Sequence, residues 1–156
     1  MNILNVREYI ETFLKIRTKD GTLMPLRLNQ PQDRMYQAVK SQWDAGKPVR
    51  IIVLKARQMG FSTLTEAIIF AITATRFYTD CMIVAHKDEA TANLFRMSLR
   101  YYENLPEPMK PMRKASNAHE LVFDKPAHYK GRRPGLGSSI KCATAGGSGA
   151  GRSATL

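Results

Sequence analysis

The residues best suited to chemistry stand in the stretch 51–71, which reads IIVLKARQMGFSTLTEAIIFA. An apolar segment leads into Lys55, a turn contains Gly60, and a second apolar run begins after Ser62. Backbone N–H groups of a glycine-containing turn, and of the helix that follows it, bind phosphate oxygens in many nucleotide-binding proteins. The order strand, turn and helix therefore makes this stretch a candidate phosphate-binding loop.

The loop departs from the common phosphate-binding pattern GxxxxGK[ST] at the lysine, because Phe61 occupies that place. Phosphate transfer needs a cation near the β and γ oxygens. A long side chain from the start of the loop can supply it, so Lys55 and Arg57 are the candidate catalytic cations. Ser62 is the candidate Mg²⁺ ligand. The candidate nucleotide-binding residues of the loop are Gln58, Met59, Gly60, Phe61, Ser62 and Thr63. The alternative is an ordinary strand end with its cations in solvent.

The charge balance favours an anionic partner. The chain has 156 residues, of which 24 are Lys or Arg and 13 are Asp or Glu, giving a net charge of +11. Such an excess suits nucleic acid first and a membrane surface second. The first 17 residues lack the apolar core of a signal peptide, and no run approaches the length of a membrane span. We therefore expect a cytoplasmic protein without a membrane partner.

Hydrophobic periodicity predicts alternating strands and helices. Helices are expected at 4–17, 32–46, 62–77 and 88–105, and strands at 49–56, 80–86, 120–124 and 138–145. The segment 49–56 is apolar on both faces, which suits the centre of a parallel sheet. Asp88 is expected to cap its helix. This alternation indicates an α/β fold with a parallel sheet flanked by helices.

The loop LKARQMGFST resembles the deviant Walker A segment of the large terminase subunits of tailed bacteriophages and prophages, in which the phosphate lysine can stand at the start of the loop. Three further segments are similar to that family: PLRLNQPQDRMYQAV, DCMIVAHKDEATANLF and GGSGAGRSATL. The resemblance spans roughly residues 25–156. It implies a P-loop NTPase-like fold of the ASCE or RecA-like kind, with residues 1–24 as a helical lead-in and 25–156 as a partial ATPase domain.

The resemblance also implies roles for single residues. Lys55 would be the phosphate cation, with Arg57 on the γ-phosphate or acting as an arginine finger, although which of the two dominates stays open. Gln32 would recognise adenine, with Gln30 as the second choice, or would simply stand in the first turn of a helix. Arg152 would sense the nucleotide state. ATP and Mg²⁺ are the implied cofactors.

Two parts of the family pattern have no counterpart in the sequence. No acidic pair follows an apolar strand after the glycine-rich segment, so the chain is expected to stop before its Walker B strand. Asp124, after ELVF, comes before that segment and is in the wrong order. The carboxylates of the nuclease domain are also absent. We therefore expect nucleotide binding, with weak or no ATP hydrolysis by this chain alone.

The implied function is ATP-driven movement of double-stranded DNA into a viral capsid, with a small terminase subunit, a portal protein and a homo-oligomeric ring as further partners. Two alternatives remain: a helicase or translocase fragment, which should keep a lysine at position 61, and a basic nucleic-acid-binding module without ATPase activity. Loops rich in Gly and cations suit contact with the DNA backbone. The candidate contacts are Lys130, Arg132, Arg133 and Lys141.

Overall fold

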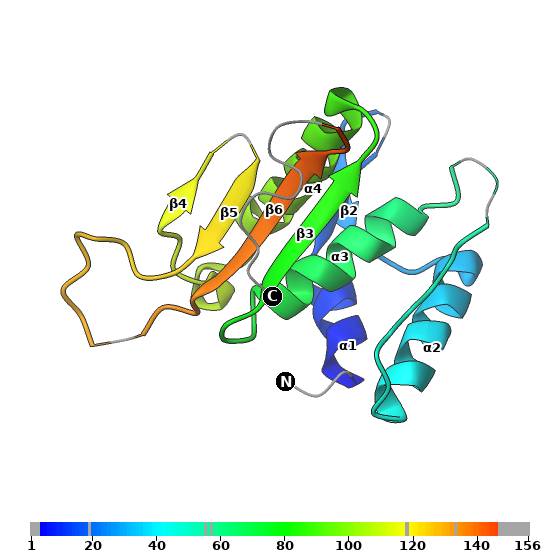
Figure 1. Cartoon of the computed structure of the whole chain (residues 1–156), viewed down its shortest axis with the longest axis horizontal. Helices are drawn as coiled ribbons and strands as arrows, with labels where there is room; N and C mark the ends of the chain where they lie inside the picture. Colours follow the sequence, from blue (N-terminus) through cyan, green and yellow to red (C-terminus); the bar gives the residue numbers. More distant parts are fainter. Residues whose placement is uncertain are drawn as a thin grey trace.

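The chain folds into a mixed α/β structure (Figure 1). The computed structural model describes residues 4–18, 20–54, 56, 58–117, 119–132 and 134–146. The elements are α1 (Leu4–Phe13), β1 (Lys15–Arg17), β2 (Leu23–Pro25), α2 (Gln30–Asp44), α3 (Phe61–Thr73), β3 (Asp80–Ala85), α4 (Asp88–Glu103), the 3₁₀ turn η1 (Glu107–Met109), β4 (Ala115–Ser116), β5 (Glu120–Phe123) and β6 (Ser138–Thr144).

The main sheet has the strand order β3-β6-β5-β4. Strands β3 and β6 are parallel, as the α/β pattern predicts, whereas β5 pairs antiparallel with both β6 and β4. Figure 1 shows α3 and α4 behind the sheet, and both helices contact β3 and β6. Met82 and Val84 of β3 are exposed, so the opposite face of this strand is open to solvent.

The core lies between the sheet and the helices. Phe70 of α3 is fully buried and meets Phe123 of β5 edge to face, with 6.0 Å between ring centroids. The Phe70 ring is also 5.6 Å from the ring of Tyr101 on α4. Val6 and Ile10 of α1 belong to the same buried cluster. Helix α3, which follows the candidate loop, is thus held on several sides by side chains from distant parts of the chain.

The prediction of a central strand at 49–56 is wrong for the described residues of this segment. Residues 47–54 form no strand, and both Ile52 and Leu54 are fully exposed. Ile51 is half-buried and packs against the core, so only one side of the segment is covered. An apolar segment becomes a central strand only when backbones on both sides pair with it. No sheet pairing involves these described residues, which leaves β3 at the edge of the main sheet.

Three smaller predictions also need correction. The first helix ends at Phe13, because residues 15–17 form a strand that pairs with β2 in a hairpin. Asp88 is the first residue of α4 and does not cap it; Lys87 is the N-cap and has no capping side-chain bond. The apolar segment DCMIVAH predicts a second core strand, but β3 is half-exposed and does not lie in the core. The remaining predicted helices and strands are confirmed within a few residues.

Within the described part of the chain, no helix is both long and apolar enough to cross a bilayer.

Candidate nucleotide-binding site

The candidate loop has a tight backbone that ends on the N-terminus of α3. Gln58 and Gly60 have φ angles of +63° and +76°, both in the left-handed region. A side chain at residue 60 would be strained at this φ, and its Cβ would lie 2.6 Å from Gln32 Nε2. Gly60 is therefore required here by its conformation and by the close approach of a neighbouring side chain.

Gly60 is also the N-cap residue of α3, and no side chain caps the helix at this position. The first N–H groups of a helix have no partners within it, and the helix dipole makes this end favourable for anions. Ser62 is exposed at the start of the helix, and Thr63 is half-buried beside it. The structure thus presents a hydroxyl and helical N–H groups where the sequence predicts phosphate and Mg²⁺ contacts.

The residue at the lysine position, Phe61, is half-buried. Its ring lines one cavity with Met59 and Ile51 and a second, of about 250 Å³, with Ser62 and Glu66. Its surroundings are mostly apolar, so Phe61 contributes packing next to the loop and no charge.

Gln32, the predicted adenine contact, is turned toward the loop. Its Nε2 donates a hydrogen bond to the Gly60 carbonyl (2.8 Å), and its Oε1 accepts one from the Asn29 N–H (3.0 Å). The side chain of Asn29 in turn accepts a hydrogen bond from the Gln32 N–H (2.9 Å), which completes a capping box at the start of α2. Gln30, the second choice, is exposed.

The sequence reasoning missed Glu66, the only charged residue in the apolar run 64–73. Its side chain is 1% exposed, and Ser98 on α4 donates a hydrogen bond to its Oε1. Burial raises the pKa of the carboxyl from 4.5 to about 7, and the Ser98 bond offsets this only in part. A lone charge inside an apolar helix was the signal that could have revealed it.

Replacing Glu66 with Gln is expected to remove a pH dependence of stability. The folded state prefers the protonated carboxyl. The contribution of Glu66 to the free energy of unfolding is therefore complete below pH 4.5 and is lost as the pH rises toward about 7. Gln keeps the acceptor for Ser98 and has no charge to bury. We expect the variant to gain about 3 kcal/mol over the parent at pH 8 and nothing at pH 4. Urea unfolding of both proteins at the two pH values measures this. If the two proteins differ in free energy of unfolding by the same amount at both pH values, the raised pKa of Glu66 is contradicted.

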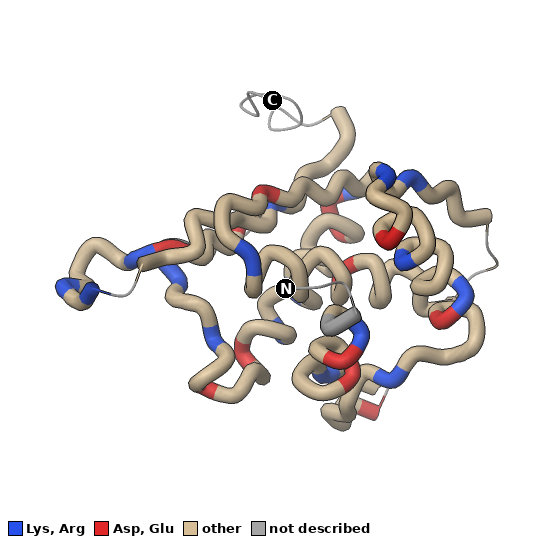
Figure 2. The backbone as a smooth tube through the Cα atoms, turned by 90° about the horizontal axis from the view of Figure 1, so that it is seen from below, with Lys and Arg blue, Asp and Glu red and all other residues tan. Residues whose placement is uncertain are grey.

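The predicted DNA contacts fall in two places. Lys130 and Arg132 are exposed in the long loop between β5 and β6, whereas Lys141 is half-buried within β6, in register with Met82 and Glu120. Figure 2 shows Lys and Arg spread over several elements, including the tip of this loop. The structure therefore does not gather the described candidates into one patch. Other predicted site residues lie outside the described residues: Lys55, Arg57, Arg133 and Arg152.

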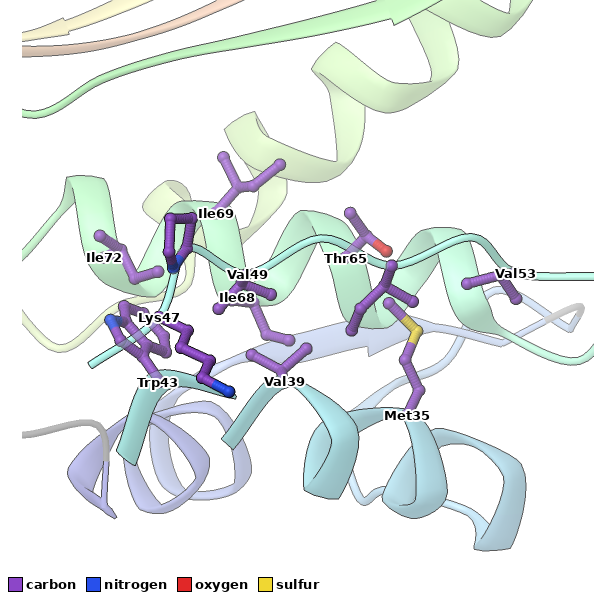
Figure 3. Close-up of a pocket in the computed structure, with 12 residues that line it drawn as sticks. Met35, Val39, Trp43, Lys47, Val49, Val53, Thr65, Ile68, Ile69 and Ile72 are labelled. Atoms are coloured by element: carbon purple, nitrogen blue, oxygen red, sulfur yellow. The ribbon is translucent and has the colours of Figure 1, made fainter. Parts of the chain in front are cut away.

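A cavity of about 560 Å³ lies away from the loop, between α2 and α3. Figure 3 shows Met35 and Val39 of α2 and Ile68 of α3 around it, with Val49 of the unpaired segment at its side. Its lining is mostly apolar, and among the described residues that line it Lys47 alone is charged. Such a lining does not suit phosphate groups, so we do not place the nucleotide there.

Comparison with known proteins bears on the fold. No protein-family profile matches the chain, and no curated protein does. Among solved structures, the chain is similar to the large terminase of bacteriophage HK97, with a TM-score of 0.69 and 19% sequence identity. The match covers 94% of this chain and 28% of the terminase chain. The chain therefore has the fold of part of a bacteriophage large terminase, as its sequence resemblance led us to expect.

Proposed function

We propose that the chain is the nucleotide-binding part of a viral DNA-packaging motor, in which ATP hydrolysis drives double-stranded DNA into a capsid. The observation that carries this proposal is the uncapped N-terminus of α3 behind the left-handed Gly60, in a chain with the fold of a phage large terminase. A small terminase subunit, a portal protein and a ring of like chains belong to the same proposal as partners of the complete motor.

The described residues fit ATP and Mg²⁺. The backbone at Gly60 leaves no room for a side chain, and the N–H groups of Phe61 and Ser62 begin the helix, as a phosphate cradle requires. The Ser62 hydroxyl is exposed at the place where this type of loop holds Mg²⁺. Mg²⁺ held there by Ser62 would supply positive charge to offset the negative charge that develops during phosphoryl transfer.

The two cations assigned from the sequence complete the site. Lys55 would neutralise the phosphates from the start of the loop, and Arg57 would contact the γ-phosphate. Their charges replace the one that Phe61 cannot carry.

Adding ATP and Mg²⁺ together to the parent chain tests the proposal directly. We expect a fluorescent ATP analogue to bind saturably. This binding should require Mg²⁺, and unlabelled ATP should displace the analogue. Absence of binding would leave a basic nucleic-acid-binding module as the better description.

DNA binding by the proposed motor should depend on salt and not on sequence, because a packaging motor must grip any duplex. Removing two cations from the loop between β5 and β6, as Lys130→Ala with Arg132→Ala, is expected to reduce the slope of log K against log salt by about 2. Fluorescence anisotropy with duplexes of unrelated sequence, at several salt concentrations, measures this slope.

The matched control removes the same charge elsewhere, as Lys15→Ala with Arg27→Ala, since both residues are exposed on or beside the small hairpin. The control should leave the slope unchanged. An equal reduction of this slope in both double variants would mean that DNA binding depends only on net charge. A strong preference for one duplex sequence would favour the module without ATPase activity.

A further inference from the structure

The start of α2 is joined to the phosphate loop by one side chain. Gln32 is 4% exposed, and both ends of its amide are engaged: Oε1 accepts from the Asn29 N–H, and Nε2 donates to the Gly60 carbonyl. The same carbonyl accepts the Leu64 N–H at 3.0 Å, which is the first helical bond of α3. Gln32 therefore bonds to the residue at which loop and helix meet.

The loop at this point needs support. Gln58 has a side chain and yet adopts a left-handed φ, which costs free energy that the surrounding structure must supply. Gly60, two residues later, is also left-handed. The three atoms nearest to a Cβ built at Gly60 belong to the side chains of Gln32 and Asn29.

The end of α2 that carries Gln32 is itself held in place. Arg7 of α1 forms an ion pair with Asp33 at 2.6 Å, and its backbone N–H donates to the Tyr36 hydroxyl at 3.2 Å. Pro31 occupies the first turn of the helix, where its fixed φ suits helix initiation. The capping box with Asn29 completes the support. A side chain anchored in this way can fix the backbone that it bonds to.

We propose that Gln32 is a positioning residue for the phosphate loop and does not read the base of the nucleotide. The proposal rests on the function proposed above and concerns the same site. Gln32 holds the Gly60 carbonyl so that the N–H groups after it point to phosphate. Its contribution to affinity is therefore the same for any ligand with the triphosphate, whatever base that ligand carries.

Three ligands separate the two roles: Mg²⁺-ATP, Mg²⁺-GTP and inorganic tripolyphosphate with Mg²⁺, which has no base. Gln32→Glu keeps the acceptor for Asn29 and replaces the donor to Gly60 with an oxygen. It is expected to weaken the binding of all three ligands by the same factor, about tenfold. Gln37→Ala, a change at an exposed residue further along α2, should alter none. Weaker ATP binding with unchanged GTP and tripolyphosphate binding would show that Gln32 reads adenine and would overturn the proposal.

The pH dependence of this variant gives a second readout. The substituted carboxyl, once protonated, can donate to the Gly60 carbonyl again. The ratio of variant to parent affinity for tripolyphosphate should therefore rise toward one as the pH falls from 8 to 5. A ratio that stays constant over this range counts against a specific bond to the loop.

Hydrogen exchange in the nucleotide-free protein keeps this inference separate from the proposed function. The amides of residues 60–64 should exchange several-fold faster in Gln32→Glu and in Gln32→Ala than in the parent, with the amides of β6 unchanged. Unchanged exchange at the loop in both variants would overturn the inference. A parent that binds none of the three ligands, with faster loop exchange in the variants, would refute the nucleotide function and leave the link between α2 and the loop standing.

Discussion

Replacing Lys55 with alanine is expected to weaken binding of a fluorescent Mg²⁺-ATP analogue by about 100-fold, or about 2.7 kcal/mol. The physical reason is that a charge-assisted contact to phosphate is among the strongest single hydrogen bonds in a protein. The loop has no lysine at position 61 to take over. Titration monitored by anisotropy measures the change, with Mg²⁺ held in excess so that both proteins meet the same ligand.

Phe61→Ala is the control, because it changes the residue that stands at the usual lysine position. Phe61 lines two apolar cavities, so its loss should affect packing and leave ATP affinity within about threefold of the parent. Arg57→Ala decides which cation dominates: the larger loss marks the main phosphate contact. If neither Lys55→Ala nor Arg57→Ala binds less tightly than the parent, the displaced-cation hypothesis is wrong.

Replacing Phe70 with alanine is expected to lower the free energy of unfolding by roughly 3–5 kcal/mol. Phe70 is fully buried on α3, and its ring contacts those of Tyr101 on α4 and Phe123 on β5. Its removal leaves a cavity where one helix meets both a second helix and the sheet. Urea unfolding followed by circular dichroism measures the loss. A destabilisation below 1 kcal/mol would mean that α3 is not held as described.

Ile52→Ala serves as the matched control for burial. Ile52 is also large and apolar, but it is fully exposed in the unpaired segment, so its replacement should change stability by no more than about 0.5 kcal/mol. The comparison tests the corrected place of this segment as well. If Ile52→Ala lowers the free energy of unfolding as much as Phe70→Ala does, residues 49–54 lie in a sheet, as the hydrophobic pattern alone predicted.

The two stability experiments bear on the site because α3 carries the candidate phosphate-binding N–H groups. Phe70 is the tenth residue of the helix, away from Gly60, and its contacts fix the helix axis. Gln32 fixes the other end through the Gly60 carbonyl. A loosened helix in Phe70→Ala should thus bind the ATP analogue less tightly even where the protein remains folded.

The sequence by itself determined the features that depend on neighbours along the chain. The apolar run after Ser62 specifies a buried helix, and the alternation in 120–123 and 138–144 specifies strands. Gly60 was recognisable as the turn because a left-handed residue before a helix favours glycine. These elements are set by backbone geometry and by periodic burial within a short segment, which a reader of the sequence can count.

Only the tertiary structure decided where each segment and side chain finds its partner. The residues 49–54 have the composition of a central strand, but a strand exists only where another backbone pairs with it, and none of the described strands does. The destination of the Gln32 amide depends on a carbonyl 28 residues away in sequence, and the burial of Glu66 on a serine 32 residues away. Contacts at such separations follow from the packing of the whole chain, and local patterns do not encode them.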